Sequence, residues 1–149
     1  MKICLVCSSG GHFSQLYSLR KFWEEFEHFW VTFPGRDTTS LLQNEKVYWA
    51  YYPTNRNIKN LIKNIILAIK ILKKKKPDVV ISTGAGVSVP FIYIAKLLRI
   101  KTIYIESLTR INGLSLSAKL VYPVVDHLIV QWPELENRYG KAKFVGQVI

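Results

Sequence analysis

Residues Ile3–His12 read ICLVCSSGGH, an apolar run of strand type that passes directly into a glycine-rich turn. Residues Asp78–Val87 read DVVISTGAGV and repeat this arrangement, and both turns lead into segments of helical character. Turns of this kind present backbone N–H groups at the positive end of a helix dipole, where phosphate groups bind readily. Two such turns in one small chain predict a cleft for a ligand that carries a diphosphate.

Strand-like and helix-like segments alternate along the whole chain. The expected strands are Ile3–Cys7, Phe29–Thr32, Val47–Tyr52, Asp78–Ser82, Thr102–Ile105 and Leu128–Gln131. The expected helices are Phe13–Glu27, Thr38–Asn44, Ile58–Lys76, Val89–Leu98, Ser115–Tyr122 and Pro133–Tyr139. This alternation predicts an α/β fold, a doubly wound, Rossmann-like parallel sheet with helices on both faces. Ligands of such folds bind at the carboxyl ends of the strands, so the two glycine turns are expected to share one cleft.

The length of 149 residues predicts a single domain that covers residues 1–149. The chain carries 21 Lys and Arg against 10 Asp and Glu, a net charge of +11, which indicates an anionic partner. Nucleic acid, a phosphorylated substrate and acidic lipid headgroups all fit that charge. Nucleic acid is not expected, because the aromatic residues fall within strand and helix patterns and no RNA-binding consensus or basic recognition helix is recognisable.

The two cysteines, Cys4 and Cys7, stand three residues apart in an expected strand and so face opposite sides of the sheet. We expect two buried thiols in a reducing cytoplasm and neither a metal site nor a cofactor. Met1 runs straight into the first strand, so no secretory leader is expected.

Two common nucleotide-binding motifs do not fit the glycine turns. A nicotinamide dinucleotide site would need Gly-x-Gly-x-x-Gly and an acid at the end of the second strand. That strand instead ends in Thr32-Phe33-Pro34, and Asp37 is displaced into the following loop. A P-loop is also excluded, since no Gly-Lys-Ser/Thr follows either turn.

Two titratable residues stand at the expected cleft. His12 lies where the first turn enters its helix, and an imidazole there can contact a phosphate or accept a proton near neutral pH. A solvated histidine at a helix start is the alternative. Glu106 follows the fifth strand, where a carboxylate can orient a sugar hydroxyl or act as a base, or can simply pair with Arg110.

The segment Asn57–Lys76 forms an amphipathic helix with lysines on its polar side. Its apolar stripe, expected to dock on the sheet, comprises Ile58, Leu61, Ile62, Ile65, Ile69 and Leu72. The opposite arc combines Lys59, Lys63, Lys70 and Lys74 with Leu67 and Ile71. Lysines around exposed aliphatic side chains suit the surface of an anionic bilayer, although a solvated basic face has the same composition. The lysines interrupt the helix too often for it to span a bilayer.

Several stretches make the chain similar to a known family. They are Ser8–Leu16, Ser82–Pro90, Tyr104–Arg110, Leu114–Lys119 and Asp126–Pro133, and Phe144–Gly146 looks like the family's closing strand. The chain resembles the acceptor-side, membrane-recruiting subunit of the bipartite N-acetylglucosaminyltransferase of asparagine-linked glycosylation. It resembles still more the bacterial PssD/CpsF-type subunits of capsule and exopolysaccharide synthesis.

The resemblance implies the N-terminal half of a GT-B glycosyltransferase similar to MurG. Such a subunit would bind a polyprenyl-diphosphate-linked saccharide, while a separate polypeptide binds the UDP-sugar, and the pair would transfer the sugar with inversion. The isolated chain is then expected to be inactive. His12 and Glu106 are the candidate catalytic residues. The residues expected to bind the acceptor and its diphosphate are Ser9, Gly10, Gly11, Gly84, Ala85, Gly86 and Arg110.

Eukaryotic members of the family begin with a membrane-spanning anchor, whereas this chain begins at its first strand. Peripheral attachment to the cytoplasmic face of the membrane would then rest on Asn57–Lys76. By analogy the apolar tail, with Val145, Val148 and Ile149, would help to hold the partner subunit, and a frayed chain end is the alternative. Two other functions stay open, a non-catalytic enhancer of the partner and a self-sufficient nucleotide-binding protein.

Overall fold

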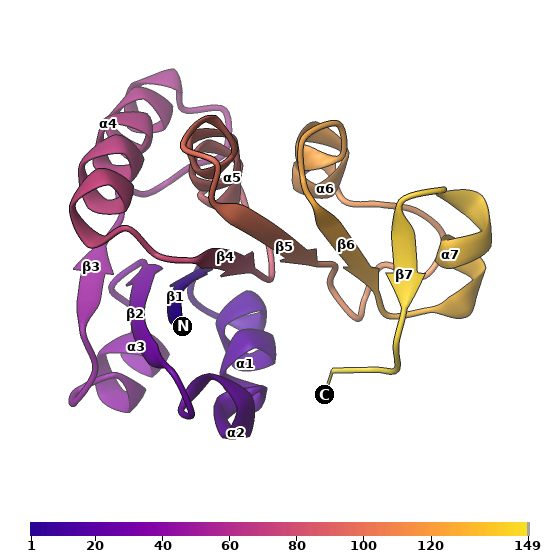
Figure 1. The fold of residues 1–149 in the computed structure, drawn as a ribbon, viewed down its shortest axis with the longest axis horizontal. Coiled ribbons are helices and arrows are strands. Elements are labelled where there is room, and N and C mark those ends of the chain that lie inside the picture. Colours follow the sequence, from indigo (N-terminus) through magenta and orange to yellow (C-terminus); the bar gives the residue numbers. More distant parts are fainter. Residues whose placement is uncertain (149) are drawn as a thin grey trace.

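Seven parallel strands form one sheet in the computed structural model, which describes residues 1–148 (Figure 1). The strands are β1 (Lys2–Val6), β2 (Glu27–Thr32), β3 (Val47–Trp49), β4 (Val79–Ser82), β5 (Lys101–Ile105), β6 (His127–Val130) and β7 (Ala142–Phe144). Their order is β3-β2-β1-β4-β5-β6-β7, so the chain builds outward from β1 and then returns to start again at β4 on the other side. The predicted doubly wound sheet is confirmed.

Helices cover both faces of this sheet. They are α1 (Gly11–Ser18), α2 (Arg20–Trp23), α3 (Arg36–Leu41), α4 (Ile58–Lys75), α5 (Ser88–Leu97), α6 (Leu116–Val121) and α7 (Pro133–Arg138). Helices α4, α5 and α6 lie on one face and α1, α2 and α3 on the other (Figure 1). Helix α7 packs beside β6 and β7 at the far end of the sheet.

The alternation of side chains along β1 divides the core into two layers. Ile3 and Leu5 are buried with α1 and α2, whereas Cys4 and Val6 are buried with α4, α5 and α6. Successive residues of a strand point to opposite faces, so a run that is apolar throughout is covered on both sides. Cys4 and Cys7 are free thiols in these two different layers. Burial raises the pKa of Cys4, and it raises the pKa of Cys7 to about 12.

The expected helix Phe13–Glu27 is wrong in its second half. The helical segment breaks at Leu19 into α1 and α2, and Glu27 already belongs to β2. This break brings the indole of Trp23 beneath the sheet, where Nε1 donates to the carbonyl of Leu16 at 3.1 Å. The Trp23 ring also packs edge-on against Trp30, with 5.3 Å between the ring centroids.

The expected strand Val47–Tyr52 is also too long. Strand β3 ends at Trp49, because the backbone of Tyr51 turns away from the sheet to bond with α4. The Tyr51 N–H donates to Oδ1 of Asn64, and Nδ2 of Asn64 donates to the Tyr51 carbonyl, both at 2.9 Å. The side chain of Asn64 thus replaces the strand partner that Tyr51 would otherwise need.

The same contact fixes the rotation of α4 and overturns the predicted orientation of this helix. Its buried residues are Asn64, Ala68, Ile71 and Leu72. Leu67 is partly buried against the same core. The prediction that Leu67 and Ile71 face the solvent is therefore wrong. Much of the stripe that was expected to dock is exposed instead: Ile58 by 74%, Ile62 by 53% and Leu61 by 41%.

Candidate functional site

The two glycine turns lie next to each other at one edge of the sheet. The first follows β1 and the second follows β4, and these two strands are paired in parallel register, with Val6 opposite Ser82. The order of the strands reverses between β1 and β4, which is where crevices form at the carboxyl ends of doubly wound sheets. The prediction that both turns belong to one cleft is consistent with this arrangement.

His12 and Thr83 tie the two turns together. Nδ1 of His12 lies 2.7 Å from the carbonyl oxygen of Thr83, and the Thr83 hydroxyl donates to the carbonyl of His12 at 2.6 Å. Because a carbonyl oxygen only accepts, Nδ1 carries the proton in this contact. In neutral His12 the other nitrogen, Nε2, then holds the free lone pair. Within residues 1–148, Nε2 has no hydrogen-bond partner.

The contact between the turns depends on Gly84, whose φ of +121° lies in the region that favours glycine. A Cβ at this position would approach Cε1 of His12 and the hydroxyl of Tyr104 to 2.9 Å each. Tyr104 is fully buried beneath the turn. Burial above all, and then the charge of Glu106, raise the pKa of its phenol, so Tyr104 stays protonated and neutral.

The first turn already holds a carboxylate of the protein itself. Oδ2 of Asp37 accepts from the N–H of Gly10 at 2.7 Å, and Oδ1 accepts from the N–H of Thr38 at 2.8 Å. Ser9 is partly exposed, and its Cβ would be 3.0 Å from a Cβ added at Gly35. Nothing lies near Gly11, whose Cα would carry a side chain into open space. The N–H of Gly10, which was predicted to bind an anion, therefore already donates to Asp37.

The second turn keeps two of its N–H groups open, those of Ala85 and Gly86, whereas the Gly84 N–H donates to the hydroxyl of Ser82 at 3.1 Å. Ala85 has a φ of +72°, and Gly86 lies against Thr54, whose hydroxyl would be 2.9 Å from a Cβ at that position. The N–H groups of Ala85 and Gly86 donate to no acceptor within residues 1–148. They precede α5, a helix of ten residues, so its dipole adds to their attraction for an anion.

Glu106 does not have the environment of a catalytic base. Its side chain is fully buried, Oε1 accepts from the N–H of Ser107 at 2.8 Å, and Oε2 accepts from the N–H of Ser115 at 2.7 Å. Both oxygens thus close the loop that joins β5 to α6. Gln15 of α1 adds a hydrogen bond from Nε2 to the Glu106 carbonyl at 2.9 Å. The expected alternative, an ion pair with Arg110, is wrong, since no such pair occurs in the described residues 1–148. A catalytic role of Glu106 stays a prediction.

Arg110 is exposed on that same loop. The loop is held from the far end of the sheet, where Nε1 of Trp132 donates to the carbonyl of Leu108 at 2.8 Å and Arg138 donates to the carbonyl of Asn112. Arg110 therefore sits on a fixed loop after β5, one strand beyond the second glycine turn.

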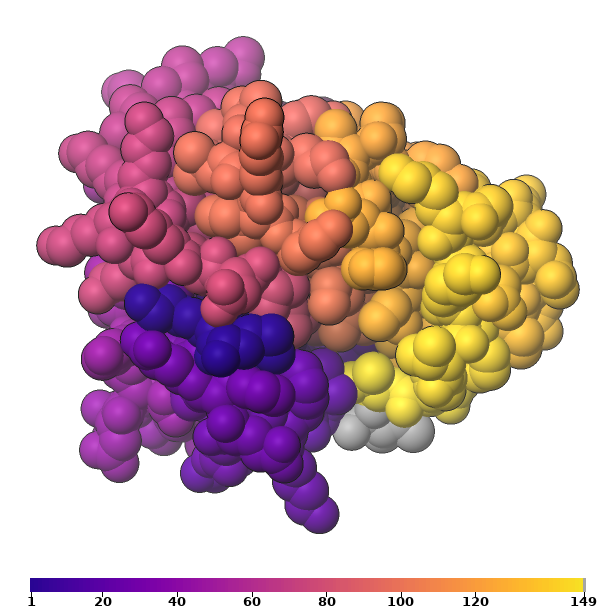
Figure 2. Space-filling model, in the orientation of Figure 1, coloured from indigo at the N-terminus to yellow at the C-terminus, as the bar shows by residue number. Residues whose placement is uncertain are grey.

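The remaining predicted site residues lie elsewhere. Lys59, Lys63, Lys70 and Lys74 are exposed along α4. In the tail, Val145 is exposed, while Val148 turns back to pack against the α1 side of the core and donates its N–H to Oε1 of Gln131 at 2.7 Å. Figure 2 shows the C-terminal segment, in yellow, next to the purple part of the chain. Ile149 lies outside the described residues.

Sequence reasoning missed three residues that build the site, Thr83, Asp37 and Tyr104. An acid placed shortly after the second strand was the available signal for Asp37, because β2 pairs with β1 and brings the two strand ends together. Nothing in the pattern marks Thr83 or Tyr104. Among residues 1–148 no group of His, Cys, Asp and Glu side chains could hold a metal ion, and no helix has the length and hydrophobicity needed to cross a membrane.

Comparison with known families gives one match over nearly the whole chain. The family described as "Oligosaccharide biosynthesis protein Alg14 like" matches residues 3–148. The UDP-N-acetylglucosamine transferase subunit ALG14 of Debaryomyces hansenii is 30% identical over an alignment 177 residues long. The alignment covers 99% of this chain and 76% of that protein. The human subunit of the same name is 34% identical over 89 residues, 56% of this chain and 41% of that protein.

Solved structures share the fold at low identity. MurG of Acinetobacter baumannii superposes with a TM-score of 0.74 at 20% identity, over 89% of this chain and 42% of that one. UDP-GlcNAc 2-epimerase of Methanocaldococcus jannaschii superposes with a TM-score of 0.77 at 17% identity, over 99% of this chain and 46% of that one. The chain thus spans less than half the length of these enzymes and has the fold of their N-terminal, GT-B type domains.

Proposed function

The chain belongs to the Alg14-like family of oligosaccharide biosynthesis proteins, and on this premise we propose that it is the acceptor-binding, membrane-recruiting subunit of a two-part glycosyltransferase. The pair transfers a sugar from a UDP-sugar to a polyprenyl-diphosphate-linked saccharide, with inversion at the anomeric carbon. This subunit binds the lipid-linked acceptor on the cytoplasmic face of the membrane. A separate subunit binds the nucleotide sugar. The product belongs to a cell-surface polysaccharide such as a capsule or exopolysaccharide.

The observation that carries this proposal is the junction of the two turns by His12 and Thr83. It brings the open N–H groups of Ala85 and Gly86, the exposed Gly11 and one imidazole to the same edge of the sheet. A diphosphate needs several N–H donors within the span of two phosphoryl groups, and the second turn supplies them at a helix start. The carboxylate of Asp37 repels an anion from Gly10, which directs the diphosphate toward the second turn.

His12 is the candidate general base. The acceptor hydroxyl attacks the anomeric carbon of the donor, the bond from that carbon to the UDP oxygen breaks, and UDP leaves with the electron pair. Nε2 of His12 takes the proton of the attacking hydroxyl, because Nδ1 is already committed to the carbonyl of Thr83. Binding the diphosphate next to this imidazole positions the acceptor for attack, so that part of the binding energy serves the reaction.

Helix α4 recruits the chain to the membrane, and the face of α4 that contacts the membrane is not the face predicted from the sequence. Ile58, Ile62 and Ile66 stand four residues apart on the exposed side and form one apolar stripe. Lys59 and Lys63 stand next to it, and such a combination suits the headgroup region of an anionic bilayer. The segment that leads into α4 touches the second glycine turn through Thr54. A bilayer on this stripe would therefore lie near the proposed diphosphate site.

The partner subunit would complete the active site from the carboxyl edge of the sheet. Val148 is fixed to Gln131 at the end of β6, which leaves the exposed Val145 on the tail for contact with another chain. Ile149, the last of the proposed tail contacts, follows directly.

The test is reconstitution with and without the partner. The purified chain is combined with a separately purified nucleotide-sugar-binding subunit, a labelled UDP-sugar and a polyprenyl-diphosphate acceptor. We expect transfer by the pair and little or none by either chain alone. Strong transfer by this chain without a partner would contradict the division into two halves.

A second candidate, a scaffold that recruits and stabilises a partner carrying all the chemistry, is favoured by one observation. Both oxygens of Glu106 are taken up by backbone N–H groups, so His12 is the sole remaining residue of the two catalytic candidates. If a pair that contains His12→Ala keeps the turnover of the unmodified pair, the scaffold function is the correct one.

A further inference from the structure

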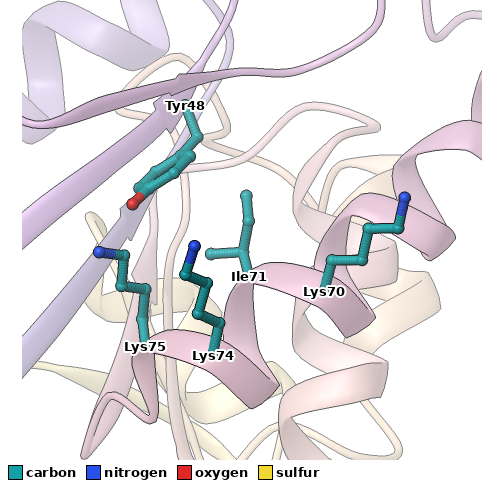
Figure 3. Close-up of a pocket in the computed structure, with 5 residues that line it drawn as sticks. All are labelled: Tyr48, Lys70, Ile71, Lys74 and Lys75. Carbon is teal, nitrogen blue, oxygen red and sulfur yellow. The ribbon is translucent and has the colours of Figure 1, made fainter.

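A hollow of about 420 Å³ lies between α4 and the edge strand β3 (Figure 3), and its lining includes no residue of the two glycine turns. Its lining consists of Tyr48 from β3 and Lys70, Ile71, Lys74 and Lys75 from the second half of α4. Ile71 is buried and forms the apolar floor. The ammonium groups of Lys74 and Lys75 point toward the Tyr48 ring, and Lys70 extends away on the other side of Ile71 (Figure 3).

The ammonium groups of Lys74 and Lys75 face this hollow, Lys70 lines its other side, and no acid is among the lining residues. No ion pair within residues 1–148 involves Lys70, Lys74 or Lys75. Mutual repulsion of the ammonium groups opposes this arrangement, and an anion bound between them relieves it. Lys75 is held in place, since its Nζ lies 5.6 Å from the centroid of the Tyr48 ring.

We propose that this hollow, here called the lysine pocket, binds a phosphate group of an anionic lipid headgroup. Lysine ammonium groups bind phosphate as point charges, and their flexible stems adapt to a headgroup of varying shape. The volume exceeds that of a bare phosphate and accommodates a glycerol backbone against Ile71 and the Tyr48 ring.

The position of the lysine pocket on α4 favours a lipid as the source of the phosphate. Lys70 and Lys74 continue the row that Lys59 and Lys63 begin, and the exposed Ile58, Ile62 and Ile66 run beside that row. A bilayer that receives this isoleucine stripe would bring its headgroups to the lysines. The inference takes only the membrane location from the proposed function and requires no catalytic role of the chain.

The experiment compares two variants of equal charge. The pocket variant carries Lys70→Gln, Lys74→Gln and Lys75→Gln. The control carries Lys73→Gln, Lys76→Gln and Lys101→Gln, three exposed lysines outside the lysine pocket. Circular dichroism of both variants verifies the fold. Binding of inorganic phosphate and of short-chain phosphatidic acid is followed by NMR of the lysine side chains, and sedimentation is measured with phosphatidylcholine vesicles that contain or lack phosphatidylglycerol.

We expect the pocket variant to bind short-chain phosphatidic acid at least about tenfold more weakly, and the control to change by less than about threefold, because general attraction is lost equally in both. Sedimentation with anionic vesicles should fall further in the pocket variant than in the control. If the pocket variant loses inorganic phosphate but matches the control on vesicles, the lysine pocket takes a free phosphate and the lipid source is wrong. Equal losses in both variants with every probe overturn the site itself. Neither result touches the transfer assay, so the proposed function is judged separately.

Discussion

Nδ1 of His12 and the carbonyl of Thr83 lie 2.7 Å apart, and the Thr83 hydroxyl returns a second hydrogen bond of 2.6 Å to the carbonyl of His12. Two residues separated by 71 positions thus lock two glycine turns from different halves of the fold. The pairing fixes both the tautomer of the imidazole and the spacing of the turns. The same two side chains therefore stabilise the junction of the turns and, in the proposed reaction, hold the general base.

Replacing His12 by alanine removes the proposed base. We expect turnover of the reconstituted pair to fall about a hundredfold or more, with a smaller change in KM for the acceptor, since general base catalysis contributes about that factor. Steady-state transfer of labelled sugar measures it. His127→Ala is the matched control, because that histidine is exposed at the start of β6 and its loss should leave turnover unchanged.

Thr83→Val tests whether Thr83 positions His12. Valine keeps the shape of the side chain and removes the hydroxyl, so the bond to the His12 carbonyl is lost at a cost of about 1 kcal/mol in unfolding free energy. We expect kcat to fall, because the imidazole is less firmly held. Thr83→Ser restores the hydroxyl and should recover both kcat and stability. A purely structural role would lower stability and leave kcat per folded molecule unchanged.

Glu106→Gln separates a structural carboxylate from a catalytic one. The amide NH₂ would face the N–H of Ser107 or Ser115, so one of these donors loses its acceptor. We expect the free energy of unfolding to fall by about 1–3 kcal/mol in urea titrations, with turnover per folded molecule nearly unchanged. Unaltered stability together with lost turnover would return Glu106 to the active site.

The corrected face of α4 gives opposite outcomes for two pairs of substitutions. Ile62→Asp with Ile66→Asp places charges on the exposed stripe and should weaken sedimentation with anionic vesicles about tenfold or more, with the fold intact. Leu67→Asp with Ile71→Asp places charges against the core and should unfold the chain. Leu97→Asp, at an exposed position near the end of α5, serves as the control for added charge. If the variant with Ile62→Asp and Ile66→Asp binds anionic vesicles as strongly as the unmodified chain, α4 does not contact the membrane.

The carboxyl group of Asp126 makes the free energy of unfolding depend on pH. Burial opposes ionisation of its carboxyl group, but hydrogen bonds from Lys96 and from the Thr102 N–H and hydroxyl prevail and hold its pKa below the usual value. Stability from a lowered carboxyl pKa is present above the pKa of the unfolded chain, about 4, and is lost as the pH falls through the lower folded value. Asp126→Asn should therefore lower the unfolding free energy by about 1–2 kcal/mol near neutral pH. The difference from the unmodified chain should shrink below about pH 3, as urea titrations at several pH values can show.

The layout of the fold was accessible from the sequence because it depends on short-range patterns. Apolar strands, helical segments and glycine turns recur in the order that is typical of a doubly wound parallel sheet. Since parallel strands end at a common edge, the nearness of the two turns followed from the same pattern. The errors in element bounds lay at positions such as Leu19 and Tyr51, where a side chain from the next element, Trp23 of α2 or Asn64 of α4, bonds to the backbone.

The sequence by itself determined the sheet, its two covered faces and the edge that carries both glycine turns, because side-chain periodicity and backbone freedom are local properties. Only the tertiary structure decided which apolar arc of α4 is buried, since both arcs carry large aliphatic residues and the bonds of Asn64 to Tyr51 select one. It likewise decided that the Glu106 carboxylate closes a loop and that the Asp37 carboxylate accepts the hydrogen bond of the Gly10 N–H. Such roles depend on which backbone N–H groups come within hydrogen-bond distance, and those donors lie far away along the chain or across a loop.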